Sequence, residues 1–196
     1  GDEVKALSVN YGQRHGKELG YALKNCLDIG VEHKVVDLTE VGKTLLYGSS
    51  QTSSDVDVPH GHYADDSMRI TVVPNRNMIM LSLAVGWAVA SKFDRVVYAA
   101  HKGDHTIYPD CRPEFYSALG KASELCDFNP IGLGAPFLHL AKADIVEMGS
   151  KLGVNFGWTW SCYEGGERHC GKCGTCVESR EAFQLSGVAD PTLYAP

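Results

Sequence analysis

The alternation of apolar and polar positions predicts an α/β fold at the start of the chain. Residues Val4–Tyr11 form a β-rich run, and Arg14–Leu27 follow with apolar side chains near positions 19, 22, 23 and 27. That spacing places the apolar side chains on one face of a helix. A second short β-rich run covers His33–Leu38. A strand, a helix and a strand in this order predict a right-handed parallel βαβ unit.

The same reading extends the α/β pattern towards the C-terminus. Residues Arg76–Lys92 predict a long helix that is apolar nearly all round, so we expect it to be buried. The β-rich run Arg95–Ala100 predicts a third strand, and Lys142–Gly153 a further helix. Between these elements, residues 48–67 are polar and rich in turn formers, which favours a mobile loop or lid. Together the elements predict a parallel sheet flanked by helices.

Composition limits the size of the fold and the class of partner. With 196 residues, 44% of them apolar, the chain is long enough for one substantial core and a small appendage. We expect an α/β domain over residues 1–153 and a C-terminal lobe over residues 154–196. The net charge of −6 argues against nonspecific binding to nucleic acids or anionic membranes. No apolar run reaches the roughly 20 residues of a membrane span, so we expect neither a membrane nor a direct nucleic-acid partner.

Polar side chains follow two of the predicted strands. The first strand runs into NYGQRH (10–15), and the third runs into HKGDHTIYPDCRPEF (101–115). Ligands of open parallel sheets gather beyond the carboxyl ends of the strands. Three cations, Arg14, Arg76 and Lys142, lie at predicted helix starts, where a bound anion such as phosphate would offset their repulsion by the helix dipole. Ordinary polar loops and solvated or carboxylate-paired cations are the alternative interpretation.

Four of the seven cysteines lie close together in CYEGGERHCGKCGTC, residues 162–176. Cys170, Cys173 and Cys176 follow CxxCxxC spacing, and Cys162 precedes them across a Gly-Gly turn. Four thiolates suit tetrahedral Zn²⁺ and leave no open position for water, so we expect a structural zinc site. An iron–sulfur cluster is the rival, but the ferredoxin run ends in CxxxCP and position 180 is Arg here. Free thiols at this spacing favour a reducing, cytoplasmic location over a disulfide framework.

Several motifs, taken in order, resemble one enzyme family. NYGQRH, VPNRN, YPDCRPEF, KADIVEMGSKLGV and TWSCYEGGERHCGKCGTCVESREAF closely resemble the 7-cyano-7-deazaguanine synthases of queuosine biosynthesis, which are PP-loop ATP pyrophosphatases. The resemblance covers nearly the whole chain. It implies a Rossmann-like nucleotide-binding domain and a zinc-bearing lobe.

The resemblance also implies a reaction. Members of the family adenylate 7-carboxy-7-deazaguanine with ATP and Mg²⁺, let ammonia displace AMP to give an amide, and convert the amide to a nitrile with a second ATP. They carry a structural Zn²⁺ and are commonly homodimers. Their Ser-Gly-Gly-x-Asp-Ser pyrophosphate loop does not occur in this chain, and by the family pattern we expect it upstream of Gly1.

Carried onto this chain, the resemblance implies roles for particular residues. The YGQRH segment faces the nucleotide or the acyl-adenylate, with Arg14 contacting phosphate, and Lys142 neutralises the phosphates of ATP. Asp110 and Arg112 read the heterocycle, on which Tyr108 stacks. The catalytic candidates are thus Arg14, Arg76 and Lys142, and the substrate-binding candidates are Tyr11, Gln13, Asn77, Tyr108, Asp110 and Arg112.

Alternatives stay open at this point. Another PP-loop enzyme would activate a different acid, for instance a relative linked to DNA modification or defence. A non-catalytic zinc-binding module is a rival of another class. Among the other cysteines, Cys26 and Cys126 are expected in the core, and Cys111 is interpreted as a packed thiol or as a nucleophile that forms a covalent thioimidate.

Overall fold

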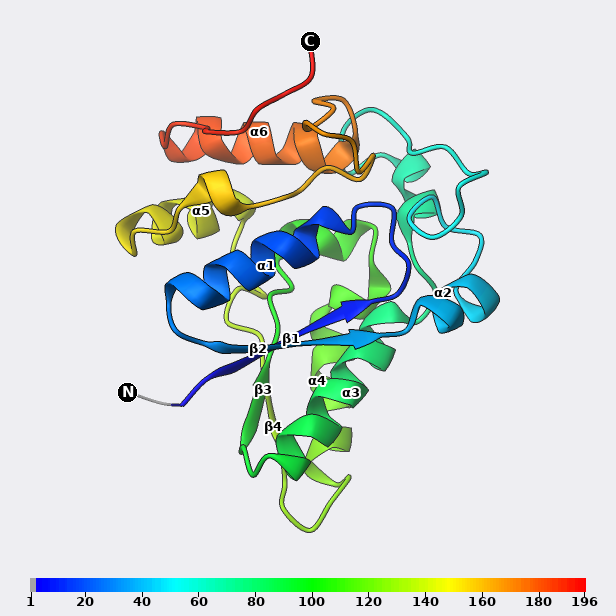
Figure 1. Cartoon of the computed structure of the whole chain (residues 1–196), viewed down its shortest axis with the longest axis vertical. Helices are drawn as coiled ribbons and strands as arrows, with labels where there is room; N and C mark the ends of the chain where they lie inside the picture. The colour runs from blue at the N-terminus through cyan, green and yellow to red at the C-terminus, as the bar shows by residue number, and fades with distance from the viewer. Residues whose placement is uncertain (1–2) are drawn as a thin grey trace. The chain divides into compact units, whose positions relative to one another are not determined.

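The computed structural model describes residues 3–196 (Figure 1). They divide into two compact units. The first unit contains the described residues up to Pro74 together with residues 146–196, and the second contains residues 75–145. Parallel strands with helices packed against them occur in both, so the predicted α/β class is confirmed. The predicted domain boundary at residue 153 stays a prediction.

The first unit begins with the predicted βαβ arrangement. Strands β1 (Lys5–Asn10) and β2 (Glu32–Asp37) pair in parallel, and α1 (Lys17–Asp28) packs against both. The helix begins three residues later than the pattern predicts, which leaves Arg14 in the turn before α1. Local hydrogen bonds explain the delay. The Gly12 N–H, at a positive φ of 78°, donates to the side chain of Asn10 and so holds the chain in a turn.

Residues 48–67, predicted to form a lid, are partly buried in the first unit. Ser49, Ser50 and Gln51 are at most 1% exposed, and the Ser50 N–H donates to the Ile70 carbonyl oxygen at 2.9 Å. The polar side chains are buried because they bond locally, for example Ser49 Oγ accepting the Gln51 N–H. This burial contradicts the expected lid over residues 49–51.

Helices α2 (Thr39–Leu45) and α6 (Gly174–Ser186), and α5 (Lys142–Lys151) from residue 146 onwards, also belong to the first unit. Helix α2 follows β2 directly, and α6 follows the cysteine-rich segment. Helix α5 confirms the helix predicted from residue 142 and buries Val146 against Ala182 and Phe183 of α6. This packing gives the C-terminal part of the first unit a hydrophobic core of its own.

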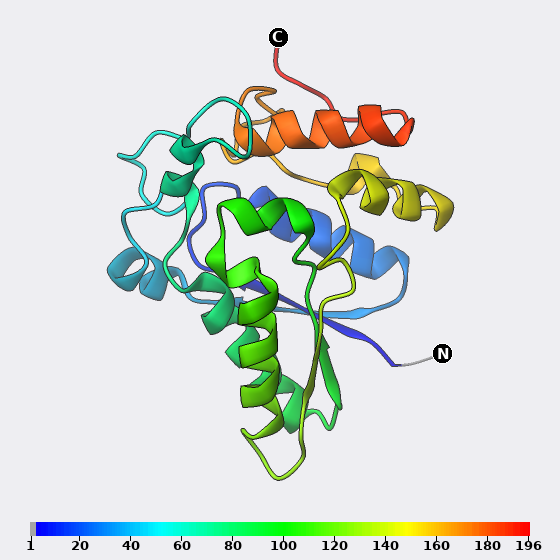
Figure 2. The same ribbon diagram turned by 180° about the vertical axis from the view of Figure 1, so that it is seen from behind.

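The second unit packs α3 (Arg76–Ala90) and α4 (Pro113–Glu124) against two short strands, β3 (Arg95–Val97) and β4 (Gly132–Gly134). The strands are parallel, and α4 packs on β4 (Figure 2). One face of α3 is buried, through Leu81, Val85 and Ala88.

The expectation that helix α3 is buried holds for one face only. Met78, on the same helix, is 38% exposed. Within the second unit α3 packs against β3 and α4, which cover one side of the helix. The predicted third strand is also shorter than expected, because β3 ends at Val97.

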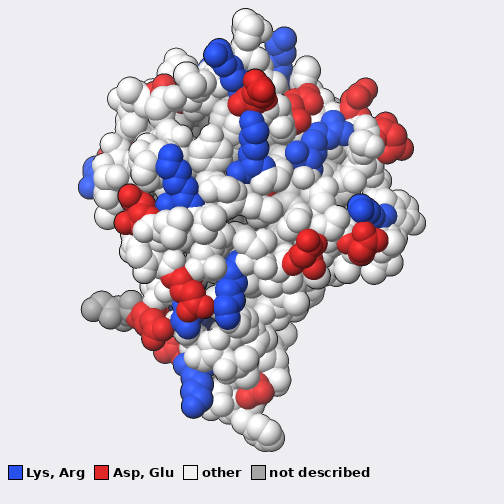
Figure 3. Space-filling model, in the orientation of Figure 1, with Lys and Arg blue, Asp and Glu red and all other residues white. Residues whose placement is uncertain are grey.

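The surface shows no single-sign face in the view of Figure 3, where acidic and basic side chains are interspersed. Among the described residues, no helix combines the length and the apolar character that crossing a bilayer requires.

Candidate functional site

The four clustered cysteines converge in the first unit. Their sulfur atoms all lie within 4.8 Å of one another, with Cys170 and Cys176 at 4.0 Å. Cys162, Cys173 and Cys176 are fully buried. Cys173 is the N-cap residue of α6, so the start of this helix places Cys176 beside the other three sulfurs. The prediction that these residues form one cluster is confirmed.

The geometry suits one metal ion. A tetrahedral Zn²⁺ with bonds of about 2.3 Å holds its four sulfurs roughly 3.8 Å apart. An iron–sulfur cluster spreads its ligands over several metal atoms and needs wider separations. A disulfide needs about 2.05 Å, and all seven cysteines are free. The four thiols can therefore hold a metal such as zinc.

Backbone amides support the sulfur atoms. The Cys170 N–H donates to Cys162 Sγ at 3.3 Å, and the Cys173 N–H donates to Cys170 Sγ at 3.2 Å. Hydrogen bonds from the neighbouring thiols of Cys162 and Cys176 hold the pKa of Cys173 well below its ordinary value. Thiolate is the form that binds a metal, so the protein stabilises the required ionisation at this residue.

His169 does not join the metal cluster, although it lies beside it in the sequence. Its Nε2 accepts the Ser161 N–H at 3.2 Å, and its ring lies 4.2 Å from the Trp160 ring between centroids. Burial lowers the pKa of His169, which favours the neutral imidazole that can accept this bond. His169 therefore packs within the first unit and is not one of the clustered metal ligands.

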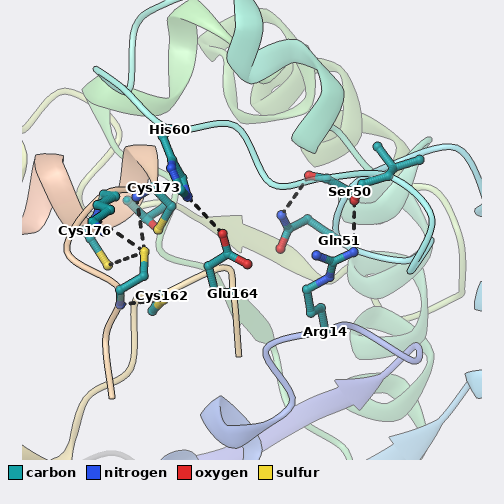
Figure 4. A network of polar contacts seen from close by, with 12 residues as sticks. Arg14, Ser50, Gln51, His60, Cys162, Glu164, Cys173 and Cys176 are labelled. Carbon is teal, nitrogen blue, oxygen red and sulfur yellow. Dashed lines mark hydrogen bonds and ion pairs between the residues drawn. The ribbon is translucent and has the colours of Figure 1, made fainter. Parts of the chain in front are cut away.

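The cysteine loop, residues 162–176, also holds a distant segment. A β-bridge joins His60 to Cys173, and the Gly61 N–H donates to the Lys172 carbonyl oxygen at 3.1 Å. Figure 4 shows His60 pointing towards Glu164 of the loop, and their side chains lie 3.0 Å apart. Part of the predicted lid is thus attached to the metal-binding loop.

The YGQRH turn, residues 11–15, is enclosed by backbone on two sides. At Gly42 of α2, an added Cβ would lie 1.8 Å from the Tyr11 carbonyl oxygen. At Gly165 of the cysteine loop, an added Cβ would lie 2.2 Å from the Arg14 carbonyl oxygen. Both contacts need glycine, because any side chain would occupy the space of the turn. These two positions fix where the turn lies within the first unit.

Side chains within the turn bond locally. The buried Gln13 accepts the Tyr11 N–H at 2.9 Å through Oε1, and its Nε2 donates to Val9 O and Glu18 Oε1. Tyr11 is 3% exposed. Two of the predicted substrate contacts therefore serve first to shape the turn.

Arg14 reaches from the turn to residues 51–56. Its Nη2 donates to the carbonyl oxygens of Ser53 and Val56 at 3.0 and 2.9 Å, and its N–H donates to Gln51 O at 2.8 Å (Figure 4). A guanidinium has five N–H donors, so these bonds orient Arg14 and leave donors for an anion. Arg14 lies two residues before Gly16, the N-cap residue of α1, so it is not part of the helix, contrary to the prediction.

The second unit contains the other candidates and brings some of them together. Arg76 is the first residue of α3, as predicted. The Asn77 N–H donates to Asp110 Oδ2 at 3.1 Å, and Asn77 Nδ2 donates to Asp110 O at 3.2 Å and to Cys111 Sγ at 3.3 Å. The YPDCR segment and the start of α3 therefore form one hydrogen-bonded group.

The remaining candidates differ in their exposure. Tyr108 is 4% exposed, and the exposed Arg112 donates through Nε to the His105 carbonyl oxygen at 2.8 Å. Lys142 is the first residue of α5, where Asp144 accepts the Ala141 N–H at 2.8 Å. The dipole conflict expected at Lys142 is thus moderated by a carboxylate in the first turn.

Cys111 is buried, and its environment opposes ionisation. Burial raises the pKa of the Cys111 thiol to about 12, and the carboxylates of Asp104 and Asp110 act in the same direction. A thiol that stays protonated is a poor nucleophile. The structure therefore supports a packed thiol at this position. Cys126 is exposed, contrary to the expectation that it lies in the core.

Sequence reasoning missed Gly42 as a residue that shapes the site, and identified Gly165 only as part of a turn. A glycine inside a helix is a signal of close backbone approach, but the sequence does not name its neighbour. Only the structure shows that both glycines contact the YGQRH turn.

Parallel strands flanked by helices and a loop with four clustered cysteines define the class of this chain: an α/β protein whose cysteines could hold a metal ion. A family model described as queuosine biosynthesis protein QueC matches residues 1–187. The chain belongs to this family, which agrees with the Rossmann-like class predicted from the motifs.

Individual relatives cover nearly all of the chain. A 7-cyano-7-deazaguanine synthase of Pseudoalteromonas atlantica is 50% identical over 194 residues, covering 99% of this chain and 88% of the relative. A protein of the same name from Methanoregula boonei is 51% identical, covering 100% of this chain and 89% of the relative. Another from Brucella anthropi is 56% identical, covering 96% of this chain and 81% of the relative. These relatives support an ATP-dependent ligase.

Proposed function

We propose that the protein converts 7-carboxy-7-deazaguanine and ammonia to 7-cyano-7-deazaguanine at the expense of ATP. The observation that carries this proposal is about 50% identity to synthases of that name over 99% of the chain. The motifs behind the expected reaction lie in both units of the structure. No observation favours a different acid substrate or a non-catalytic module.

The reaction needs charge neutralisation at each activation. The carboxylate attacks the α-phosphorus of ATP and releases pyrophosphate, and ammonia then displaces AMP from the acyl-adenylate to give the amide. A second ATP adenylates the amide oxygen, and loss of AMP and a proton forms the nitrile. Both activations place phosphate charge beside the protein, so positioned cations supply most of the catalysis.

The cations of this chain suit that task. Arg14, Arg76 and Lys142 are proposed to contact phosphate or carboxylate oxygens, with Arg favoured where two oxygens are bound at once. ATP brings Mg²⁺, which neutralises charge on its phosphates when bound. Tyr11 and Gln13 are proposed to shape the turn that faces the nucleotide, since both are buried there.

The YPDCR segment and its partner Asn77 are proposed to form the heterocycle site. Arg112 is exposed and oriented by the His105 carbonyl, so it is the candidate for direct contact, and Tyr108 supplies an aromatic wall. Asp110 and Asn77 bond to each other, so their contribution is proposed to be indirect.

Zinc is proposed as the ion in the four-cysteine site, with a structural role because four thiolates complete a tetrahedral shell. The chemistry of the reaction then lies elsewhere in the protein. We further propose a cytoplasmic enzyme, since a zinc site needs reduced thiols, and a homodimer, for which light scattering of the purified protein is the test.

A product assay tests the function. The encoded protein, with any residues that precede Gly1, is mixed with ATP, Mg²⁺, ammonium and 7-carboxy-7-deazaguanine, and AMP release and product mass are followed. AMP together with the nitrile is the expected result. AMP with the amide alone would indicate an enzyme that stops halfway, and no AMP from a folded, zinc-loaded protein would overturn the proposal.

A further inference from the structure

The start of α3 lacks a cap of its own. Its N-cap residue, Asn75, has a left-handed φ of 55° and makes no side-chain capping bond, and the first turn holds no acidic residue. The first N–H groups of any helix have no intrahelical partner. A helix that begins with an arginine therefore needs both a hydrogen-bond acceptor and a negative charge from elsewhere.

Asp110 supplies both from 33 residues further along the chain. Its Oδ2 accepts the N–H of Asn77, the second residue of α3, at 3.1 Å. The Asn77 amide returns a bond to the Asp110 carbonyl oxygen at 3.2 Å and another to Cys111 Sγ at 3.3 Å. Three hydrogen bonds thus attach the short helix η3 (Pro109–Cys111) to the first turn of α3.

Arg76 precedes Asn77 directly, so the same bonds fix the backbone that carries the guanidinium. The charge of Arg76 also acts on the Cys111 thiol, where it opposes the rise of that pKa. The guanidinium therefore lies within electrostatic reach of the segment that Asp110 anchors.

We propose that Asp110 is a positioning residue, which caps α3 and thereby holds Arg76 in its substrate-binding orientation. This inference rests on the proposed function, because it assigns Arg76 to the substrate. Asp110 then acts through the hydrogen bond that it accepts, and the heterocycle is left to other residues. Direct recognition of the heterocycle by Asp110 would instead require the carboxylate to face an N–H edge of the base.

Substitution of Asp110 by asparagine distinguishes capping of α3 from direct contact with the base. The amide oxygen of asparagine can still accept the hydrogen bond from the Asn77 N–H. If Asp110 instead bound an N–H edge of the base, asparagine would replace one of the two accepting oxygens with an NH2 donor, and this contact would be lost. We therefore expect Asp110→Asn to retain kcat/KM within about threefold and Asp110→Ala to lose about tenfold or more, because a small misplacement of a binding group is costly. Asp127→Ala is the matched control, since Asp127 accepts a backbone N–H in an exposed turn of the same unit.

The closing experiment is a double-mutant cycle with Arg76→Ala. If Asp110 acts through Arg76, adding Asp110→Ala to Arg76→Ala changes kcat/KM by less than about twofold, although each substitution alone is harmful. A second readout, hydrogen exchange at the Asn77 amide, should be faster in Asp110→Ala and close to wild type in Asp110→Asn.

Each contrary result is decisive. Equal losses for Asp110→Asn and Asp110→Ala, or additive losses with Arg76→Ala, would overturn the inference and favour direct contact with substrate. Unchanged exchange at Asn77 in Asp110→Ala would overturn it as well, and this measurement does not depend on turnover. If Asp110→Ala does not fold, the kcat/KM of Asp110→Asn and its hydrogen exchange at the Asn77 amide still test the inference. A large loss of kcat/KM with unchanged exchange would overturn it. A wild-type protein that makes no product contradicts the proposed function alone.

Discussion

The contact between Gly42 and the YGQRH turn can be tested by adding one methyl group. In Gly42→Ala the new Cβ would lie 1.8 Å from the Tyr11 carbonyl oxygen and 2.8 Å from its carbonyl carbon. Real Cβ atoms essentially never approach closer than 3.0 Å, so helix α2 and the turn must separate by at least 1.2 Å, the difference between 3.0 and 1.8 Å. The nearest neighbours are backbone atoms of Tyr11, which cannot rotate away as a side chain can.

The expected loss of stability follows from two opposing effects. Alanine favours a helix interior by up to about 1 kcal/mol over glycine, and forcing extra atoms into a packed site costs about 1–3 kcal/mol, occasionally more. Gly20→Ala in α1 is the matched control, because nothing lies within 4 Å of its added Cβ. Both variants gain helix propensity but only Gly42→Ala has the packing cost, so the two should differ by about 1–3 kcal/mol.

Thermal unfolding of the two variants measures this difference. For a protein of this size, 1 kcal/mol corresponds to a shift of about 2–4 °C, so Gly42→Ala should melt about 2–12 °C below Gly20→Ala. Its kcat/KM should also fall by about tenfold or more, because the turn that carries Arg14 is displaced. If the two variants melt within about 1 °C of each other, the close approach of α2 to the turn is wrong.

Four further predictions concern single cysteine and glycine residues. Cys173→Ser should lose bound zinc by elemental analysis and melt about 10 °C or more below wild type, whereas a folded, metal-free variant that loses only turnover would contradict a structural site. With a thiol pKa of about 12, Cys111 has about one thiolate in ten thousand molecules at pH 8. Mass spectrometry should then find iodoacetamide on the exposed Cys126 long before Cys111, and comparable rates would refute the packed thiol. The folded protein raises this pKa from 9.0, so the contribution of Cys111 to stability is complete below pH 9 and is lost as the pH rises from 9 towards 12. The melting temperature of Cys111→Ala should therefore fall less steeply than that of the wild type over this pH range. Gly165→Ala should destabilise more than Gly187→Ala, since both have a φ of 69° but only the first meets a backbone oxygen, at 2.2 Å. Equal melting temperatures for the two glycine variants would contradict this contact.

The elements that sequence predicts well are those set by local pattern. The period of apolar residues locates β1, α1 and β2, and the CxxCxxC spacing locates the metal ligands, because neighbouring residues impose both. The end of a strand or the first residue of a helix is less certain. Arg14 falls in a turn because Gly12 and Asn10 hold the chain there, and a hydrophobic period does not register such bonds.

Contacts between distant segments are what the sequence does not supply. Nothing in the residues around Asp110 indicates that its carboxylate caps a helix 33 residues earlier. A charged residue in a polar motif is equally compatible with binding a ligand and with satisfying a backbone N–H. The buried serines and glutamine of residues 49–51 show the same ambiguity. Polar residues in a sequence predict a solvated loop, because the sequence does not show which hydrogen-bond partners could let them be buried.

The metal loop and the predicted catalytic turn are physically connected in the first unit. Gly165 of the loop contacts the Arg14 carbonyl oxygen, and Cys173 pairs with the backbone at His60. Arg14 in turn holds the carbonyl oxygens of Ser53 and Val56. An ion bound by the four cysteines would therefore also order the groups around Arg14. Loss of the metal should consequently reduce turnover through displacement of this turn, together with the loss of stability and not as a separate catalytic step.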